Sequence, residues 1–204
     1  MQLPDFLDNL AKRDIVLASG SPRRRELLGQ LGLTFCLGHA GDIDETYPAD
    51  LAAVDVAPYL SRLKADHYRR IAMQPNDLVI CADTVVIIDD TVLGKPTDEA
   101  DACRMLSRLS GRTHRVVTGI TLEWNDGSEP KRLTDRAITE VTFAQLSREE
   151  IRWYVENYKP LDKAGAYGIQ EWIGAAAVSR IDGSYSNVMG LPLHLLYEML
   201  LKVR

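Results

Sequence analysis

Residues 15–25 read IVLASGSPRRR, a stretch in which an apolar run is followed by a polar turn and a row of arginines. The apolar run at residues 15–18 is short and uninterrupted, which is typical of a buried β-strand. Ser21 followed by Pro22 is the pattern of an N-cap and a first helical position, and leucines recur at helical spacing behind it. The stretch predicts a strand, a tight polar turn and a helix, with Gly32 as the cap at the helix end.

Helical and strand-like patterns continue outward from this stretch. Apolar spacing and capping signals predict helices over residues 56–71, 97–109, 147–158 and 192–203. Apolar or β-branched runs predict strands over residues 78–88, 91–93, 115–124, 132–143 and 175–181. Asn125-Asp126-Gly127 predicts a hairpin turn between the two longest strands. We therefore expect an α/β fold with a mixed sheet rather than a strict strand–helix repeat.

The composition is that of an ordinary globular protein. The 204 residues are 46% hydrophobic and 26% charged, enough for one large domain or two closely joined ones. The formal net charge of −5 argues against a general nucleic-acid binder. No apolar run is long enough for a membrane helix and no signal peptide is visible, so we expect no membrane partner and a cytoplasmic location.

The cysteines are Cys36, Cys81 and Cys103, an odd number at wide spacing. This pattern predicts neither a disulfide framework nor a zinc site. We expect buried, reduced thiols instead.

The turn after the first strand is a candidate phosphate site. Backbone N–H groups at a helix N-terminus attract anions, and the hydroxyls of Ser19 and Ser21 add donors. Arg23, Arg24 and Arg25 lie at the positive end of the helix dipole, where their charge is unfavourable. A bound polyanion explains this arrangement better than the alternative, a solvated basic turn.

Asp83 and Thr84 interrupt an otherwise apolar strand. A buried carboxylate requires a cation, a metal ion or hydrogen bonds, because leaving it unpaired costs several kcal/mol. Asp83 is therefore a candidate general base or metal ligand, with a structural salt bridge as the alternative. A hairpin between residues 88 and 91 could return Lys95 to the same neighbourhood, although a lysine in such a place is more often exposed.

Two further groups of residues carry weaker signals. Asp42, Asp44 and Glu45 cluster in a loop that either holds a divalent ion or is simply solvated. Lys163 and Gln170 lie in a glycine-rich loop, and the amide of Gln170 has donors and acceptors suited to a base edge.

Six segments taken together resemble the Maf-type nucleoside triphosphate pyrophosphatases. They are LASGSPRR (17–24), ADTVV (82–86), GKP (94–96), LSGRTH (109–114), DKAGAYGIQ (162–170), and DGSY with VMGLP (182–192). The resemblance starts near residue 15, so we expect one Maf-like domain over residues 1–204 with residues 1–13 as an N-terminal extension. It implies a mixed twisted sheet with flanking helices in two lobes around a cleft, related to ITPase-like folds, and a homodimer.

The family resemblance also implies an activity. It implies hydrolysis of a nucleoside triphosphate to the monophosphate and pyrophosphate, with a divalent metal, Mg²⁺ or Mn²⁺. Carried over by position, Asp83 accepts the proton of the attacking water, and Glu45 joins it near the metal. Ser19, Arg24 and Lys95 hold phosphates, with Lys163 as a further candidate.

Arg23, Thr84 and Gln170 resemble the specificity residues of the branch that acts on dTTP and UTP, with modified pyrimidine nucleotides as further substrates. Two alternatives stay open. One is a pyrophosphatase for other non-standard nucleotides, and the other is a nucleotide-binding regulator of cell division without turnover.

Overall fold

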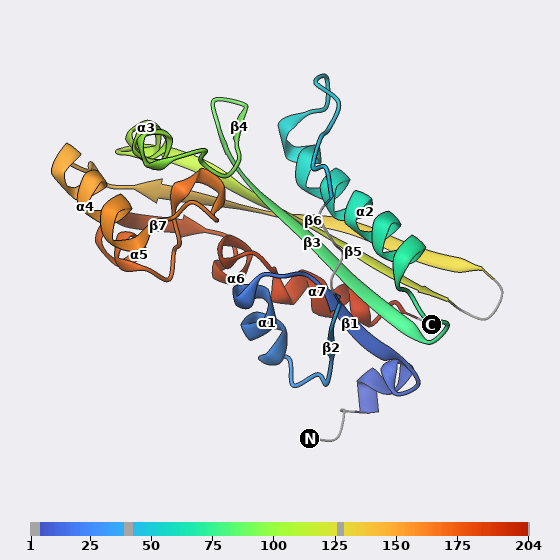
Figure 1. Ribbon diagram of the computed structural model, residues 1–204. Coiled ribbons are helices and arrows are strands. Elements are labelled where there is room, and N and C mark those ends of the chain that lie inside the picture. The colour runs from blue at the N-terminus through green and yellow to red at the C-terminus, as the bar shows by residue number, and fades with distance from the viewer. Residues whose placement is uncertain (1–4, 39–42, 126–128, 204) are drawn as a thin grey trace. The chain divides into compact units, whose positions relative to one another are not determined.

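The computed structural model describes residues 5–38, 43–125 and 129–203. Its helices are η1 (Asp5–Leu10), α1 (Pro22–Gly29), α2 (Ala53–Ile71), α3 (Glu99–Leu109), α4 (Arg148–Tyr158), η2 (Ala164–Ala166), α5 (Trp172–Ala177), α6 (Tyr185–Met189) and α7 (Leu193–Leu200). Its strands are β1 (Asp14–Ala18), β2 (Cys36–Gly38), β3 (Asp77–Ile88), β4 (Thr91–Leu93), β5 (Thr113–Asn125), β6 (Pro130–Phe143) and β7 (Val178–Asp182) (Figure 1).

The strands form one mixed sheet of seven, in the order β2-β1-β3-β5-β6-β7, with β4 paired to β3. β1 pairs in parallel with both β2 and β3, whereas the β3–β4 and β6–β7 pairs are antiparallel. β5 ends at Asn125 and its neighbour β6 begins at Pro130. Since parallel strands need a crossover of a dozen or more residues, this short connection makes them antiparallel, as predicted. The predicted turn residues Asp126 and Gly127 lie outside the described residues. The α/β prediction is confirmed.

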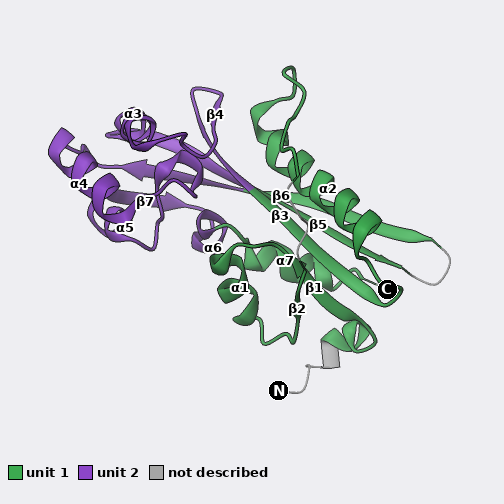
Figure 2. Cartoon of the chain, viewed as in Figure 1, with its two compact units in different colours: residues 1–83, 118–137, 190–204 green, residues 84–117, 138–189 purple. Residues whose placement is uncertain are grey.

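The chain divides into two compact units (Figure 2). Unit 1 comprises residues 1–83, 118–137 and 190–204, and unit 2 comprises residues 84–117 and 138–189. Strands β3, β5 and β6 each contribute residues to both units, so the division does not follow the order of the chain.

Unit 1 is built around the parallel strands β1 and β3. Val16, Ala18, Val79 and Cys81 from these strands pack with Ala65 and Tyr68 of α2 in one buried cluster. The N-terminal segment also belongs to this unit, because Leu7 and Leu10 are buried and Asn9 donates to the carbonyls of Leu200 and Val203. The segment that precedes the family resemblance therefore caps the C-terminal end of α7.

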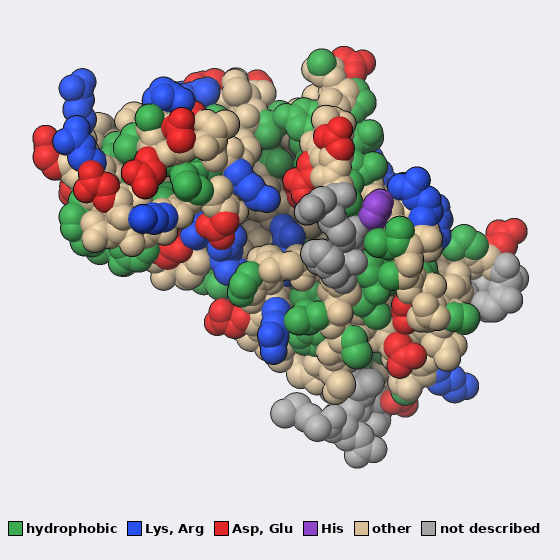
Figure 3. Space-filling view, viewed as in Figure 1, with side chains coloured by type: hydrophobic (Ala, Val, Ile, Leu, Met, Phe, Trp, Pro, Cys, Tyr) green, Lys and Arg blue, Asp and Glu red, His purple; other side chains and the backbone are tan. Residues whose placement is uncertain are grey.

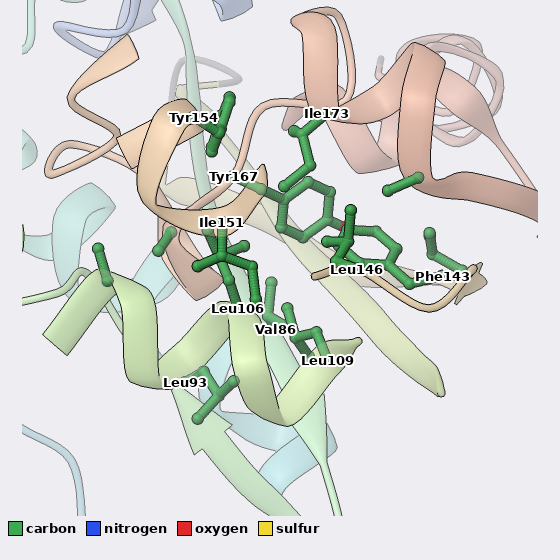
Figure 4. Packing of buried hydrophobic residues seen from close by; sticks show 14 of the residues in the cluster. Val86, Leu93, Leu106, Leu109, Phe143, Leu146, Ile151, Tyr154, Tyr167 and Ile173 are labelled. Carbon is green, nitrogen blue, oxygen red and sulfur yellow. The ribbon is translucent and has the colours of Figure 1, made fainter. Parts of the chain in front are cut away.

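Unit 2 has its own apolar core (Figure 4). Leu106 and Leu109 of α3 and Ile151 of α4 pack with Phe143 and Tyr167. α4 begins with the predicted capping box, in which Ser147 Oγ accepts from Glu150 N at 3.2 Å and Glu150 Oε2 accepts from Ser147 N at 2.7 Å. Tyr167 belongs to the loop of residues 162–170, so its packing against these helices holds that loop in place.

Several local predictions are corrected by the structure. The strand predicted over residues 175–181 is wrong in its first half, because α5 continues to Ala177 and β7 begins at Val178. The run Ala175-Ala176-Ala177 favours helix, and the β-branched residues follow it. The N-cap of α3 is Asp98 rather than Thr97, since Asp98 Oδ1 accepts from Asp101 N at 2.7 Å.

Further features differ from the sequence-based predictions. α1 ends at Gly29, before the left-handed Gly32 that was expected to cap it. β2 and α6 are short and were not foreseen. Cys36 is exposed, contrary to the expectation of buried thiols, whereas Cys81 is buried.

Charge on unit 2, all of whose residues are described, is mixed. Acidic and basic side chains are interspersed over the face that carries α3 and α4 (Figure 3). On the face shown, positive charge does not form the continuous stripe that would follow a phosphate backbone. Among the described residues, no helix combines the length and apolarity needed to cross a membrane.

Candidate active site

The pairing of β1 with β3 places Ser19 near Asp83. The two strands are parallel, with Leu17 opposite Ile80. Ser19, directly after β1, therefore lies level with Ala82, one residue before Asp83. Ligands of open α/β sheets bind beyond the carboxyl ends of the strands, which is where Ser19 stands.

Arg24 of α1 is oriented by two contacts within unit 1. Its Nη1 donates to Ser19 Oγ at 3.3 Å, and its Nε donates to the carbonyl oxygen of Gly190 at 2.8 Å. Burial lowers the pKa of Arg24, and the nearby carboxylates of Asp83 and Glu45 oppose this effect. The guanidinium is thus held near two acids, Asp83 and Glu45.

Asp83 is buried and paired with a lysine. Its side chain is 9% exposed, and its Oδ1 lies 2.5 Å from Lys64 Nζ. The same ammonium lies 2.9 Å from Glu45 Oε1. Burial raises the pKa of Asp83, while the charges of Lys64 and Arg24 lower it. A buried Asp83 was expected to need a cation, a metal ion or hydrogen bonds. The structure shows a cation, Lys64, and this is the salt bridge named as the alternative to a catalytic role.

Lys64 was missed in the sequence, although a signal existed. It lies four residues after Leu60 and three before His67, both on the apolar stripe predicted for this helix. A lysine on the buried side of an amphipathic helix needs an acidic partner, and a buried Asp83 needs a partner of its own. These two requirements are met together by a Lys64–Asp83 pair.

Unit 2 brings together two of the other predicted segments. Gly165 N donates to the carbonyl oxygen of Gly94 at 3.0 Å, which joins the segment of Lys95 to the segment of Lys163. Lys163 is buried, with its Nζ 2.7 Å from Asp162 Oδ1 and 3.1 Å from Glu171 Oε1. Lys95 is exposed.

Tyr154 and Glu171 hold the loop that ends at Gln170, and neither was singled out in the sequence. The hydroxyl of Tyr154 donates to Glu171 and accepts from Gly168 N at 3.1 Å. A Cβ on Gly168 would lie 3.0 Å from Gln170 Nε2 and 2.8 Å from Glu171 Cδ, so these side chains fold closely over the glycine. Gln170 itself is exposed.

The predicted residues thus fall into two groups. Within unit 1 the structure brings together Ser19, Arg24, Glu45 and Asp83, around Lys64. Within unit 2 it joins the segments of Lys95, Lys163 and Gln170. Arg23 and Thr84 are half-buried and directly adjoin Arg24 and Asp83 in the sequence, and Asp44 is exposed. Asp42 lies outside the described residues.

The described acids of unit 1 do not form a dedicated metal cage. Among the described residues, no group of three or more His, Cys, Asp or Glu side chains could hold a metal ion. Glu45 and Asp83 nevertheless converge on a single cation, the ammonium of Lys64. Mg²⁺ is commonly held by one or two carboxylates and completed by substrate phosphates and water, which this donor set permits.

Comparison with known proteins shows the family to which the chain is similar. A family model described as Maf-like protein matches residues 14–203. A dTTP/UTP pyrophosphatase of Porphyromonas gingivalis strain W83 is 54% identical over 198 residues, which cover 96% of each chain. Proteins of the same name from Bacteroides thetaiotaomicron and Phocaeicola vulgatus are 51% and 50% identical, each over 97% of this chain and 100% of the relative.

Proposed function

Because the chain belongs to the Maf family, we propose that it is a pyrophosphatase that hydrolyses dTTP and UTP to the monophosphate and pyrophosphate. The similar relatives named for this activity cover nearly the whole chain. The observation that carries the proposal is the buried carboxylate of Asp83, paired with Lys64 Nζ at 2.5 Å and close to Arg24. A buried acid with a cationic partner beside an arginine and a hydroxyl is suited to activating water next to a phosphate.

Asp83 acts as the general base. Water attacks the α-phosphorus, its proton passes to the carboxylate of Asp83, and the bond between the α-phosphorus and the bridging oxygen breaks to release pyrophosphate. This role requires the ionised form of Asp83. Burial raises its pKa, and the ammonium of Lys64 counteracts burial by favouring the carboxylate.

We propose that cationic side chains hold the triphosphate. Arg24 has its guanidinium oriented by Ser19 and Gly190, and such a planar fork binds phosphate oxygens in pairs. Arg23, Lys95 and Lys163 add positive charge on the segments that the family resemblance assigns to phosphate. These groups favour the transition state because negative charge accumulates on the leaving pyrophosphate.

Glu45 and Asp83 are the residues we propose for the divalent metal, Mg²⁺ or Mn²⁺. Such an ion, when bound, neutralises charge on the phosphate oxygens. The chain's own contribution is a pair of carboxylates that already converge on one cation.

Gln170 and Thr84 are proposed to select the base. The exposed amide of Gln170 has both donors and acceptors, which a pyrimidine edge can satisfy together. A purine that leaves such groups unpaired is rejected, because unmade hydrogen bonds in a binding site are costly.

The test is pyrophosphate release from dTTP, UTP, CTP, 7-methyl-GTP and ITP, with and without Mg²⁺. We expect dTTP and UTP to be preferred, and Asp83→Asn to reduce turnover by roughly 10²–10⁴-fold while nucleotide binding persists. Asp77→Asn is the matched control, since Asp77 is a buried acid at the start of the same strand whose Oδ2 accepts from Gln74 N. Unchanged turnover in Asp83→Asn would refute its role, and binding without any turnover would favour the regulator.

We also propose a homodimer and a cytoplasmic location. Light scattering of the purified protein tests the first, and fractionation of the cells that produce it tests the second.

A further inference from the structure

One face of β5 carries buried polar residues that the proposed chemistry does not use. Thr121 is fully buried and Glu123 is 1% exposed. Gly119, Thr121 and Glu123 are spaced two residues apart along the strand, so they share one face. A buried carboxylate needs a reason, because an apolar residue in its place is often neutral or stabilising.

Each of these three residues contacts α2 within unit 1. A Cβ on Gly119 would lie 2.4 Å from the backbone nitrogen of Pro58, so only glycine lets the helix approach this closely. Thr121 Oγ1 lies 2.8 Å from Ser61 Oγ, and Glu123 Oε1 lies 2.9 Å from Arg69 Nη1. α2 is thus anchored to β5 at successive points along its length.

Two arginines neutralise the buried acid at the last of these points. Arg132 of β6 donates from Nε and Nη2 to Glu123 Oε2, at 3.0 and 2.5 Å. Its Nη2 also lies 2.6 Å from Asp66 Oδ1, and Asp66 pairs in turn with Arg69 at 3.0 Å. The four side chains form a closed set of two acids and two bases, which ties α2 to two strands at once.

Lys64 lies between these anchors. It follows Ser61 by three residues, about 4.5 Å along the helix axis, and precedes Asp66 by two. Its own side chain has four rotatable bonds and does not fix the position of its ammonium. Hydrogen bonds are directional, so the polar contacts on β5 set the position of α2 more sharply than apolar packing does.

We infer that Gly119, Thr121 and Glu123 form a positioning face that fixes the ammonium of Lys64 against Asp83. Thr121 and Glu123 are positioning residues that act on the reaction through Lys64. The inference rests on the proposed function, because the effect of displacing Lys64 is measured as a change in pyrophosphate release. It extends that function to a strand face that the family motifs do not include.

The test is a double-mutant cycle of Thr121→Val with Lys64→Met, followed by steady-state kinetics on dTTP. Valine keeps the shape of threonine and removes the hydroxyl that contacts Ser61 Oγ on α2 and, at 3.0 Å, Thr134 Oγ1 on β6. We expect Thr121→Val to lower kcat on the order of tenfold, with KM changed less than about twofold, because small displacements of a catalytic group are costly. In the Lys64→Met background, we expect the same substitution to have less than about a twofold effect.

The control is Thr91→Val, the same substitution at an exposed hydroxyl of unit 2 that donates to the carbonyl oxygen of Asp89 at 3.3 Å. We expect wild-type kcat from it. Circular dichroism reports whether each variant is folded, and Ser61→Ala replaces Thr121→Val in the cycle if the latter is not. An unchanged kcat in Thr121→Val, or an equal loss in both backgrounds, would overturn the inference. A wild-type enzyme that releases no pyrophosphate would instead refute the proposed function.

Discussion

We expect the buried imidazole of His114 to make unit 2 sensitive to mild acid. The side chain is 2% exposed, and its Nε2 lies 2.8 Å from the hydroxyl of Tyr167. The rings of Phe143 and Tyr167 meet it edge-on at 5.0 and 5.4 Å. Burial in these apolar surroundings lowers the pKa of His114 from 6.5 to about 4. The neutral form is therefore the one that the fold accommodates.

The sign of the effect follows from this lowered pKa. Between pH 6.5 and about 4 the unfolded chain binds a proton at His114 and the folded chain does not, so stability falls as pH falls through that window. One pKa unit corresponds to about 1.4 kcal/mol, so the full difference between 6.5 and about 4 is about 3 kcal/mol. At pH 5 the expected loss is about 2 kcal/mol, and above pH 7.5 the group contributes no pH dependence.

Urea unfolding followed by tryptophan fluorescence measures this difference, since Trp153 and Trp172 lie in the same unit. We compare the wild type with His114→Gln, whose amide reaches toward Tyr167 but does not titrate in this range. The wild type is expected to lose about 2 kcal/mol more than the variant between pH 7.5 and pH 5. His194→Gln, which changes an exposed histidine, serves as the control and keeps the wild-type response. Parallel pH dependences in the wild type and His114→Gln would refute the reasoning.

Two further predictions concern stability. Tyr154→Phe leaves Gly168 N and Glu171 without their hydroxyl partner in a buried site, so we expect a loss of about 1–3 kcal/mol in urea unfolding. Tyr158→Phe, at an exposed position stacked on Tyr154, should stay within about 0.5 kcal/mol of the wild type, and an equal loss in both variants would argue against the hydrogen bonds as the cause. Asn9→Ala removes two hydrogen bonds to carbonyls at the end of α7 and should cost about 1–2 kcal/mol. An unchanged urea midpoint would show that the N-terminal segment contributes nothing to unit 1 through this contact, with the exposed Asn157→Ala as the control.

Local patterns in the sequence were sufficient for most elements. The strand and helix around Ser19, the amphipathic helix α2, the capping box of α4 and the long strands β5 and β6 all follow from spacing and capping within a few residues. The errors occur where short-range signals compete. In residues 175–181 the alanines favour helix while the valine and isoleucine beyond them favour strand, and the boundary falls between the two.

From the sequence alone it followed that a buried Asp83 requires a partner, either a cation, a metal ion or hydrogen bonds, and that the motifs belong to one family. The folded chain shows that the partner is Lys64, nineteen positions away, and that Glu123 pairs with Arg69 and Arg132. The need for a partner can be predicted from the sequence, because the desolvation of a buried charge is costly wherever the residue lies in the chain. The partner's identity depends on which strands pair and where a helix rests on them, and these contacts join residues far apart in sequence.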